Sequence, residues 1–223
     1  MHPPRDEAAL LDRARALADR TLGWIAARVG VTVPPDLRKD KGWVGTLLET
    51  ALGATGGSAA QRDFPALGIE LKSIPLNDAG QPRESTFVCT APLGPELLVD
   101  WDQSWLRAKL TRVLWVPIHG TGPPGERQVG AAVLWSPSPA QEAVLQADWE
   151  ELSDLLGLGH FDQLDARWGQ ALQVRPKAAD SHARTWALDA NAQWVQVNPR
   201  GFYLRKSFTH SVLTAARNAP PPR

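Results

Sequence analysis

The stretch DFPALGIELKSIP, residues 63–75, constrains the fold more than any other part of the sequence. Successive side chains of a β-strand point to opposite faces, so residues two apart share a face. Ile69 and Leu71 therefore face one way, toward a buried core, while Glu70 and Lys72 face the other way together. Holding two charges on one face of a strand is costly unless they serve a purpose. The pattern predicts a strand that presents an acid and a lysine side by side.

The rest of the chain alternates between helical and strand-like patterns. A first helical segment is predicted over 6–29, with Asp6 as its N-cap and Gly30 as its stop. Further helices are predicted over 42–52, 101–109, 137–156, 162–172 and 207–217. Strands are predicted over 67–74, 86–91, 112–118, 129–135, 173–175, 193–197 and 201–204. This order predicts an α/β (or α+β) protein with a central mixed sheet and a disordered tail over 218–223.

The composition is that of a globular protein and does not choose a function. Hydrophobic residues make up 43% of the 223 residues and charged residues 22%, which is ordinary. The single cysteine, Cys89, excludes an internal disulfide and a zinc site built on several thiolates, and it lies in an apolar run where we expect it to be buried. No apolar run is long enough to cross a membrane, and the N-terminus lacks the apolar core of a signal peptide. We therefore expect a cytoplasmic protein with no membrane partner.

Charge is distributed unevenly along the chain. The formal net charge is zero, which argues against non-specific coating of nucleic acid. It leaves a DNA enzyme open, because binding depends on where charges lie rather than on their sum. From His160 onward there are nine lysines and arginines against four acids. A basic C-terminal part suits a protein that holds a polyanion.

The charged face of the predicted strand carries the residue types that phosphodiester hydrolysis needs. Asp63 stands seven residues before Glu70 and can bring a second carboxylate beside it, and Glu49 near the end of the preceding helix is a third candidate. Carboxylates are preferred ligands of Mg²⁺, and a lysine such as Lys72 can orient water or neutralise transition-state charge. Asp-(x6)-Glu-x-Lys is the general signature of PD-(D/E)XK nucleases, although acids and a lysine at loose spacing also occur by chance. The alternative is an ordinary ion pair on an exposed edge strand.

Many further blocks, in the same order and over nearly the whole chain, resemble the MutH family of mismatch-repair endonucleases. They are RKDKGWVG at 38–45, LLE at 47–49, the stretch 63–75, TFVC at 86–89, Lys109, RVLW at 112–115, VLWSP at 133–137, DWEEL at 148–152, RPKAA at 175–179 and PRGFYL at 199–204. So many blocks are much more specific than the catalytic triplet alone.

The resemblance implies a fold and an activity. The expected fold is a single MutH-like domain over 1–223, restriction-endonuclease-like, with two lobes around a DNA cleft: a catalytic lobe over about 1–110 and a DNA-recognition lobe over about 111–217. The expected enzyme is a monomer that depends on Mg²⁺, which Mn²⁺ or Ca²⁺ can replace in the site. It would nick the unmethylated strand of double-stranded DNA 5′ of the G in hemimethylated GATC sites, activated by MutL and indirectly by MutS. Asp63, Glu70 and Glu49 would hold the metal, and Lys72 would assist catalysis.

The resemblance also assigns DNA contacts that the residues alone leave open. Arg175 and Lys177 flank Pro176, whose fixed φ presents both cations in a set direction. A surface loop that contacts phosphates is the simpler interpretation, whereas the resemblance assigns them to base edges. Tyr203, the only tyrosine, matches the position that would sense a methyl group on adenine, and a core tyrosine is the alternative.

Lys41 and Lys109 are candidate phosphate contacts, with a solvated helix surface as the alternative for each. The five histidines show no ligand spacing. The segment 180–198 and the proline-rich C-terminus depart from the family, so their roles stay open.

Two other functions remain open. A self-sufficient GATC restriction endonuclease would have to cut both strands, which requires a dimer or a second catalytic domain. A catalytically silent DNA-binding module is the other, but such a binder gains nothing by placing carboxylates beside phosphates.

Overall fold

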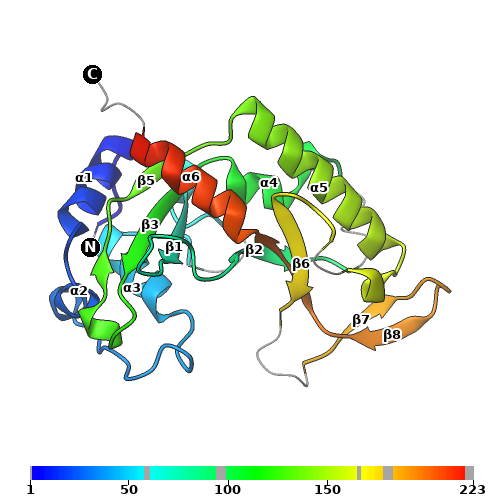
Figure 1. The fold of residues 1–223 in the computed structure, drawn as a ribbon, viewed down its shortest axis with the longest axis horizontal. Coiled ribbons are helices and arrows are strands. Elements are labelled where there is room, and N and C mark those ends of the chain that lie inside the picture. The colour runs from blue at the N-terminus through cyan, green and yellow to red at the C-terminus, as the bar shows by residue number, and fades with distance from the viewer. Residues whose placement is uncertain (1, 58–60, 94–98, 165–166, 178–182, 219–223) are drawn as a thin grey trace. The chain divides into compact units, whose positions relative to one another are not determined.

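The computed structural model describes residues 2–57, 61–93, 99–164, 167–177 and 183–218 (Figure 1). The chain folds as two compact units, each assembled from segments that are far apart in the sequence. Unit 1 consists of Met1–Glu84, Arg112–Ser136 and Val212–Arg223, and unit 2 consists of Ser85–Thr111 and Pro137–Ser211. These boundaries differ from the contiguous division expected near residue 110. The reason is that the strand following Arg112 pairs within unit 1, whereas the strand following Ser85 pairs within unit 2.

The N-terminal part of unit 1 is helical, with α1 Glu7–Leu17, α2 Leu22–Val29 and α3 Trp43–Leu52. Asp6 caps α1 through a hydrogen bond from the backbone amide of Ala9 at 2.7 Å, and Gly30 ends α2 at φ 72°. Both boundaries confirm the predictions.

The predicted helix over 6–29 is nevertheless two helices. Between them, the amide of Asp19 donates to the carbonyl of Val129, and the amide of Leu22 donates to the carbonyl of Arg127, each at 2.8 Å. Thr21 then starts α2 by capping it. An uninterrupted helix would have used these backbone groups internally, so pairing with a strand segment over 100 residues away divides it.

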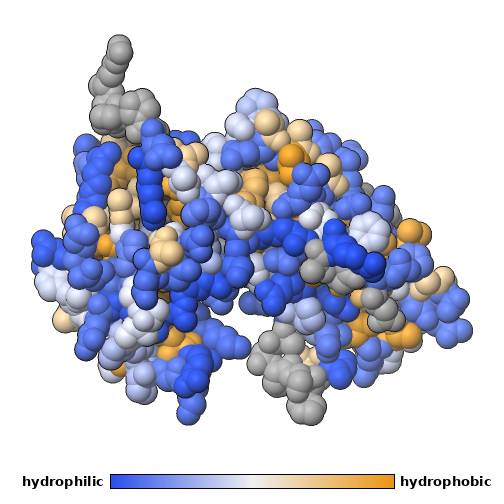
Figure 2. Space-filling view, viewed as in Figure 1, coloured by the Kyte–Doolittle hydropathy of each residue, from blue (hydrophilic) through white to orange (hydrophobic). Residues whose placement is uncertain are grey.

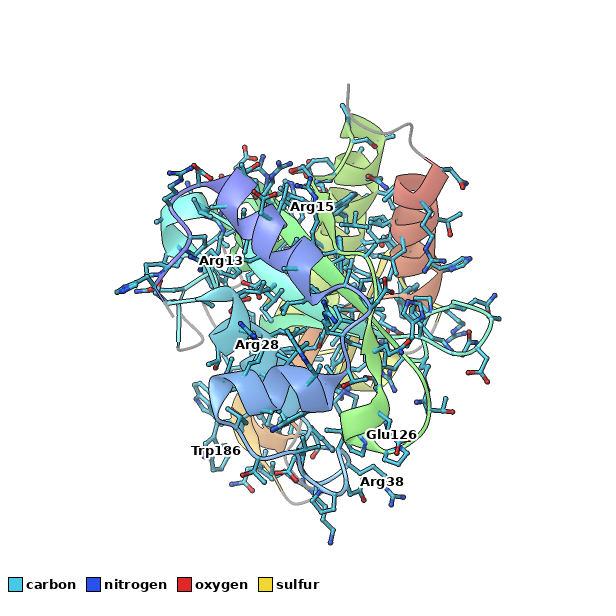
Figure 3. All side chains as sticks on the ribbon, turned by 90° about the vertical axis from the view of Figure 1, so that its left-hand side faces the viewer. Arg13, Arg15, Arg28, Arg38, Glu126 and Trp186 are labelled. Carbon is cyan, nitrogen blue, oxygen red and sulfur yellow. The ribbon has the colours of Figure 1, made fainter. Side chains whose placement is uncertain are left out.

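Arg13 ties α1 to the end of α3. Its guanidinium donates to the carbonyl oxygen of Leu52 at 2.9 Å and to that of His2 at 2.7 Å. Figure 3 shows Arg13 on α1. The last carbonyls of a helix lack intrahelical partners and favour a nearby cation. Arg13 therefore helps to fix the helix that carries Glu49.

A mixed sheet completes unit 1. Its strands are β1 Glu70–Pro75, β3 Val113–His119, β4 Gln128–Val129 and β5 Val133–Trp135. β1 pairs with β3 in parallel, while β4 and β5 pair with β3 antiparallel, which confirms the predicted mixed sheet. The predicted strand over 129–135 is thus divided into β4 and β5. The helices pack on one face of this sheet around a core that includes Leu10, Ile25, Leu48, Ile69, Leu71, Leu114 and Val116.

Unit 2 is built on an antiparallel sheet of order β2-β9-β6, where β2 is Thr86–Ala91, β9 is Arg200–Leu204 and β6 is Leu172–Pro176. β7 Thr185–Leu188 and β8 Trp194–Val197 form a separate hairpin, of which the sequence predicted only β8. The helices of this unit are α4 Trp105–Leu110 and α5 Pro139–Gly157. The last helix, α6 Lys206–Asn218, begins in unit 2 and ends in unit 1. Most of the predicted tail, from residue 219 on, lies outside the described residues.

The predicted helix over 162–172 is wrong. The structure has one 3-10 turn, η5 Phe161–Gln163, and then the strand β6. The buried carboxylate of Asp148, on α5, accepts hydrogen bonds from the amides of Gln170, Ala171 and Leu172 at 2.6–2.9 Å. A helix would need those amides for its own bonds, so a side chain from an earlier element holds this segment extended.

Candidate active site

A tight turn joins Asp63 to the first residue of β1. Two backbone hydrogen bonds between Phe64 and Ile69, of 2.9 and 3.2 Å, close it around the 3-10 turn η1 Pro65–Leu67. Gly68 adopts φ 67°, in the left-handed region that glycine enters without strain. The Oδ2 atom of Asp63 accepts a hydrogen bond from the amide of Leu71 at 2.7 Å. The turn thereby fixes the Asp63 carboxylate one residue along the strand from Glu70.

Glu70 and Lys72 form a buried ion pair on one face of β1. The Nζ atom of Lys72 lies 2.6 Å from the Oε1 atom of Glu70, and the two side chains are 15% and 2% exposed. Ile69 and Leu71 point into the helical core on the other face, as the alternation predicted. β1 is an end strand of its sheet, but the ion pair is not an exposed one, because Glu70 is buried and Lys72 is largely buried. Removing each charge from water costs on the order of several kcal/mol.

The end of α3 is tied to the backbone of Asp63. The carbonyl of Glu49 accepts the amides of Gly53 and Ala54 at 2.9 and 2.8 Å. The next two amides, of Thr55 and Gly56, both donate to the carbonyl of Asp63 at 3.0 Å. Glu49 is partly buried in the last turns of α3. The loop after α3 therefore links the helix that carries Glu49 directly to Asp63.

Arg112 supports the site from the neighbouring strand. Its carbonyl accepts the amide of Glu70 at 3.0 Å, and its guanidinium binds both carboxylate oxygens of Glu7 on α1 at 2.7 and 3.1 Å. This hydrogen bonding lowers the pKa of the Glu7 carboxyl below its usual value. Arg112 thus connects α1, the start of β3 and the start of β1.

The donor chemistry of the site fits a hard cation, although a three-carboxylate site is not assembled. In the part of the chain that the structure describes, no three His, Cys, Asp or Glu side chains form a group that could hold a metal ion. The structure therefore does not gather Glu49, Asp63 and Glu70 into one ligand set. Mg²⁺ commonly binds through one or two carboxylates and completes its octahedron with water and substrate phosphates. The carboxylates of Asp63 and Glu70 suit that mode.

Unit 2 brings together the residues expected to contact bases. Arg175 on β6 and Tyr203 on β9 share one face of the three-stranded sheet, because Arg175 pairs with Gly201 and Gln173 pairs with Tyr203. The Arg175 guanidinium lies 5.7 Å from the centre of the Tyr203 ring and donates to the Oγ atom of Ser85 at 2.7 Å.

The sequence analysis missed Phe87, which lies at the centre of this group. Its ring is 5.3 Å from the Tyr203 ring, edge to face, and the Nζ atom of Lys177 lies 3.9 Å from its centre. A Cβ atom at Gly201 would approach the Phe87 ring to 2.8 Å, so glycine allows this packing. We call Arg175, Lys177, Tyr203 and Phe87 the recognition cluster. Phe87 is identified as a member of this cluster only by the pairing of β2 with β9. The alternation of residues 86–91 predicts which face of the strand Phe87 lies on, but not which side chains it contacts.

Lys41 and Lys109 belong to different units. Lys41 is exposed in the turn before α3. Lys109 on α4 is only 8% exposed, and its Nζ atom lies 5.2 Å from the centre of the Trp105 ring. The alternative of a solvated helix surface is therefore wrong for Lys109.

These features define a class of protein. Two carboxylates and a largely buried lysine at the start of a mixed sheet, with cations and aromatic rings on a second sheet, are the components of a DNA endonuclease.

Comparison with known proteins identifies the family. The model of the family "DNA mismatch repair enzyme MutH" matches residues 52–148. The "DNA mismatch repair protein MutH" of Salmonella paratyphi C (strain RKS4594) is 51% identical over 213 residues, which cover 95% of this chain and 92% of that protein. The protein of the same name from Salmonella choleraesuis (strain SC-B67) gives the same values. The chain belongs to the MutH family of DNA mismatch repair enzymes, and its fold is the restriction-endonuclease-like fold of that family.

Proposed function

We propose that this protein is a magnesium-dependent endonuclease of methyl-directed mismatch repair. It nicks the unmethylated strand of hemimethylated GATC sites when MutL activates it, with MutS acting indirectly. The observation that carries this proposal is the buried Glu70–Lys72 pair beside Asp63, in a chain of the MutH family. The single cysteine, Cys89, is buried, which suits the reducing cytoplasm.

The chemistry divides among the residues of unit 1. When bound, Mg²⁺ would polarise the phosphate that is attacked and make a bound water molecule more acidic. Asp63 and Glu70 would hold the ion through carboxylate oxygens. Glu49, the third expected ligand, lies on the helix whose end is tied to Asp63. Lys72 has three donor hydrogens, one of which serves Glu70. The others can orient the attacking water and offset the negative charge that develops on the phosphorus oxygens.

The number of catalytic groups bears on how many strands are cut. Asp63, Glu70 and Lys72 are the one catalytic set proposed for this chain. A monomer with one such group cuts one strand per encounter, so nicking is the expected outcome.

Among described residues, no helix is long and apolar enough to span a membrane.

A plasmid assay tests the function. With Mg²⁺ and a plasmid that holds one hemimethylated GATC site, we expect open-circular product that depends on MutL and is confined to the unmethylated strand. Linear product without MutL would identify a self-sufficient restriction endonuclease instead. Binding without any cleavage would identify a catalytically silent module.

Substituting the two cations of the recognition cluster separates base contacts from phosphate contacts. We expect Arg175→Ala and Lys177→Ala each to cost about 1–3 kcal/mol on a GATC duplex and much less on a scrambled one. Binding is measured on both duplexes at two salt concentrations, with Lys206→Ala, an exposed cation of unit 2, as the control. Equal losses on both duplexes would move the two residues to phosphate contacts.

Tyr203 is expected to enforce the choice of strand. Its ring is partly exposed and held between Phe87 and Arg175. A fixed ring beside the adenine amino group would reject an added methyl group by steric overlap. We expect Tyr203→Ser to cut methylated strands, with a modest loss on unmethylated ones, whereas Tyr203→Phe keeps the ring and its selectivity. The measurement is the ratio of cleavage rates on unmethylated and fully methylated duplexes, together with a melting curve. An unchanged ratio with a lowered melting temperature would return Tyr203 to a structural role.

A further inference from the structure

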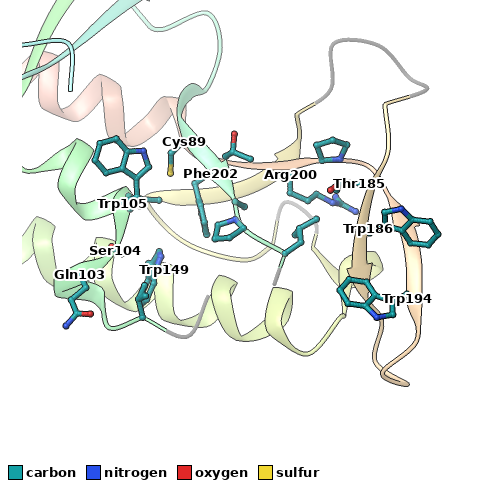
Figure 4. Close-up of a pocket in the computed structure, with 17 residues that line it drawn as sticks. Cys89, Gln103, Ser104, Trp105, Trp149, Thr185, Trp186, Trp194, Arg200 and Phe202 are labelled. Atoms are coloured by element: carbon teal, nitrogen blue, oxygen red, sulfur yellow. The ribbon is translucent and has the colours of Figure 1, made fainter. Parts of the chain in front are cut away.

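Unit 2 contains a groove on the side of its three-stranded sheet opposite to the recognition cluster (Figure 4). Side chains alternate along β9, so Arg200 and Phe202 point away from the face that carries Gly201 and Tyr203. Arg200 and Phe202 line the groove, together with Cys89 of β2, and the cavity measures about 820 Å³. The groove is therefore a separate surface from the residues proposed to read duplex DNA.

Tryptophan side chains lie at both ends of this groove. Trp105 of α4 and Trp149 of α5 lie at one end, and Trp186 of β7 and Trp194 of β8 lie at the other, with Arg200 between them (Figure 4). Trp186 and Trp194 are 58% and 64% exposed. Such large aromatic surfaces left in water indicate an interaction site rather than a core.

The β7–β8 hairpin presents these two rings on an ordered support. Trp194 pairs with Leu188 across the hairpin, so Trp186, Leu188 and Trp194 share a face, while Ala187 is buried on the other. The turn between the strands is closed by Asp189, whose Oδ1 atom accepts the amides of Asn191 and Gln193 at 2.9 Å. Figure 2 shows apolar residues interrupting the hydrophilic surface at this hairpin.

The charge of the groove favours an anionic occupant with flat rings. Among the lining residues that the structure describes, Arg200 is the one charged side chain and none is acidic. Arg200 is held in place by a hydrogen bond from its Nη2 atom to the carbonyl of Phe161 at 3.2 Å. Aromatic side chains along a groove, with positive charge and no acid, form the usual platform for unpaired bases.

We propose that this groove binds single-stranded DNA, with bases stacked on Trp186 and Trp194 and the phosphate backbone near Arg200. Duplex DNA cannot use such a site, because its base faces are already stacked. A DNA repair enzyme meets unpaired bases wherever a nicked strand separates from its complement, so the ligand is available where the enzyme acts. Binding in this groove does not depend on which DNA sequence is bound at the recognition cluster.

Binding of a labelled oligothymidylate about 12 nucleotides long, measured by fluorescence anisotropy without divalent metal, tests the proposal. The double variant Trp186→Leu/Trp194→Leu keeps apolar surface but removes both stacking rings. We expect it to bind at least about tenfold more weakly, because each stacked base contributes about 1–3 kcal/mol. Its nicking of duplex DNA stays at the wild-type rate. Trp24→Leu, in unit 1 and 39% exposed, is the matched control and binds as the wild type does.

Two outcomes would overturn the proposal: no binding of the oligonucleotide by the wild type, or equal binding by the wild type and the double variant. The second result would assign the exposed rings to the docking of an apolar protein segment instead. Repeating the measurement in an Arg175→Ala/Lys177→Ala background removes the contribution of both cations of the recognition cluster. Nicking is measured in a separate assay. A wild-type protein that fails to nick would contradict the proposed function, whereas the single-stranded DNA site is tested by the binding measurement alone.

Discussion

Asp63→Asn and Glu70→Gln are each expected to abolish nicking in Mg²⁺ while DNA binding persists or becomes tighter. Both changes remove a negative charge that would hold the metal, and both relieve repulsion of the DNA phosphates. They also preserve the fold. Asparagine keeps an oxygen for the Leu71 amide, and glutamine keeps the size of a side chain that is 2% exposed.

Nicking rates and duplex affinities, measured on the same preparations, check this expectation. Asp78→Asn and Glu84→Gln are suitable controls, because both acids are exposed in unit 1 and should leave nicking unchanged. Cleavage near the wild-type rate by either site variant would show that the metal site has been assigned to the wrong residues.

Lys72→Met is expected to be inactive for a different reason and to be much less stable. It removes the ammonium that assists the attack and leaves the buried Glu70 carboxylate without its ion-pair partner. Breaking a buried pair in this way costs about 3–5 kcal/mol. We expect the double variant Lys72→Met/Glu70→Gln to recover most of that stability, since no buried charge is left alone, yet to remain inactive.

Urea denaturation and nicking, measured on both variants, separate stability from catalysis. Mn²⁺ binding followed by calorimetry should survive in Lys72→Met and be lost in the double variant. A Lys72 variant that is stable and nicks normally, or a double variant that regains activity, would remove Lys72 from the reaction.

Local features of this fold could be predicted from sequence, and features set by distant residues could not. The Asp6 cap, the Gly30 stop and the opposite faces of β1 depend on neighbours within a few residues, and each was correct. The helix predicted over 162–172 was wrong because Asp148, more than 20 residues earlier, takes its amides.

The candidate site follows the same rule. Spacing predicted that Asp63 and Glu70 would be close, because one short turn joins them. It did not predict how deeply Glu70 is buried, since that depends on packing across the whole of unit 1. Phe87 was missed because its partners, Lys177 and Tyr203, come from segments that the chain reaches about 90 residues or more later.

The interleaved make-up of the two units has a consequence for biosynthesis. The chain crosses from one unit to the other after Glu84, Thr111, Ser136 and Ser211. A nascent chain that has left the ribosome as far as residue 111 holds β1 but lacks β3, its hydrogen-bonded neighbour. The Glu70–Lys72 pair can therefore reach its final surroundings only after β3 has been synthesised. Because the end of α6 belongs to unit 1, that unit is the last to receive all of its segments, whereas β1 and β3 are both present once residue 119 has been added.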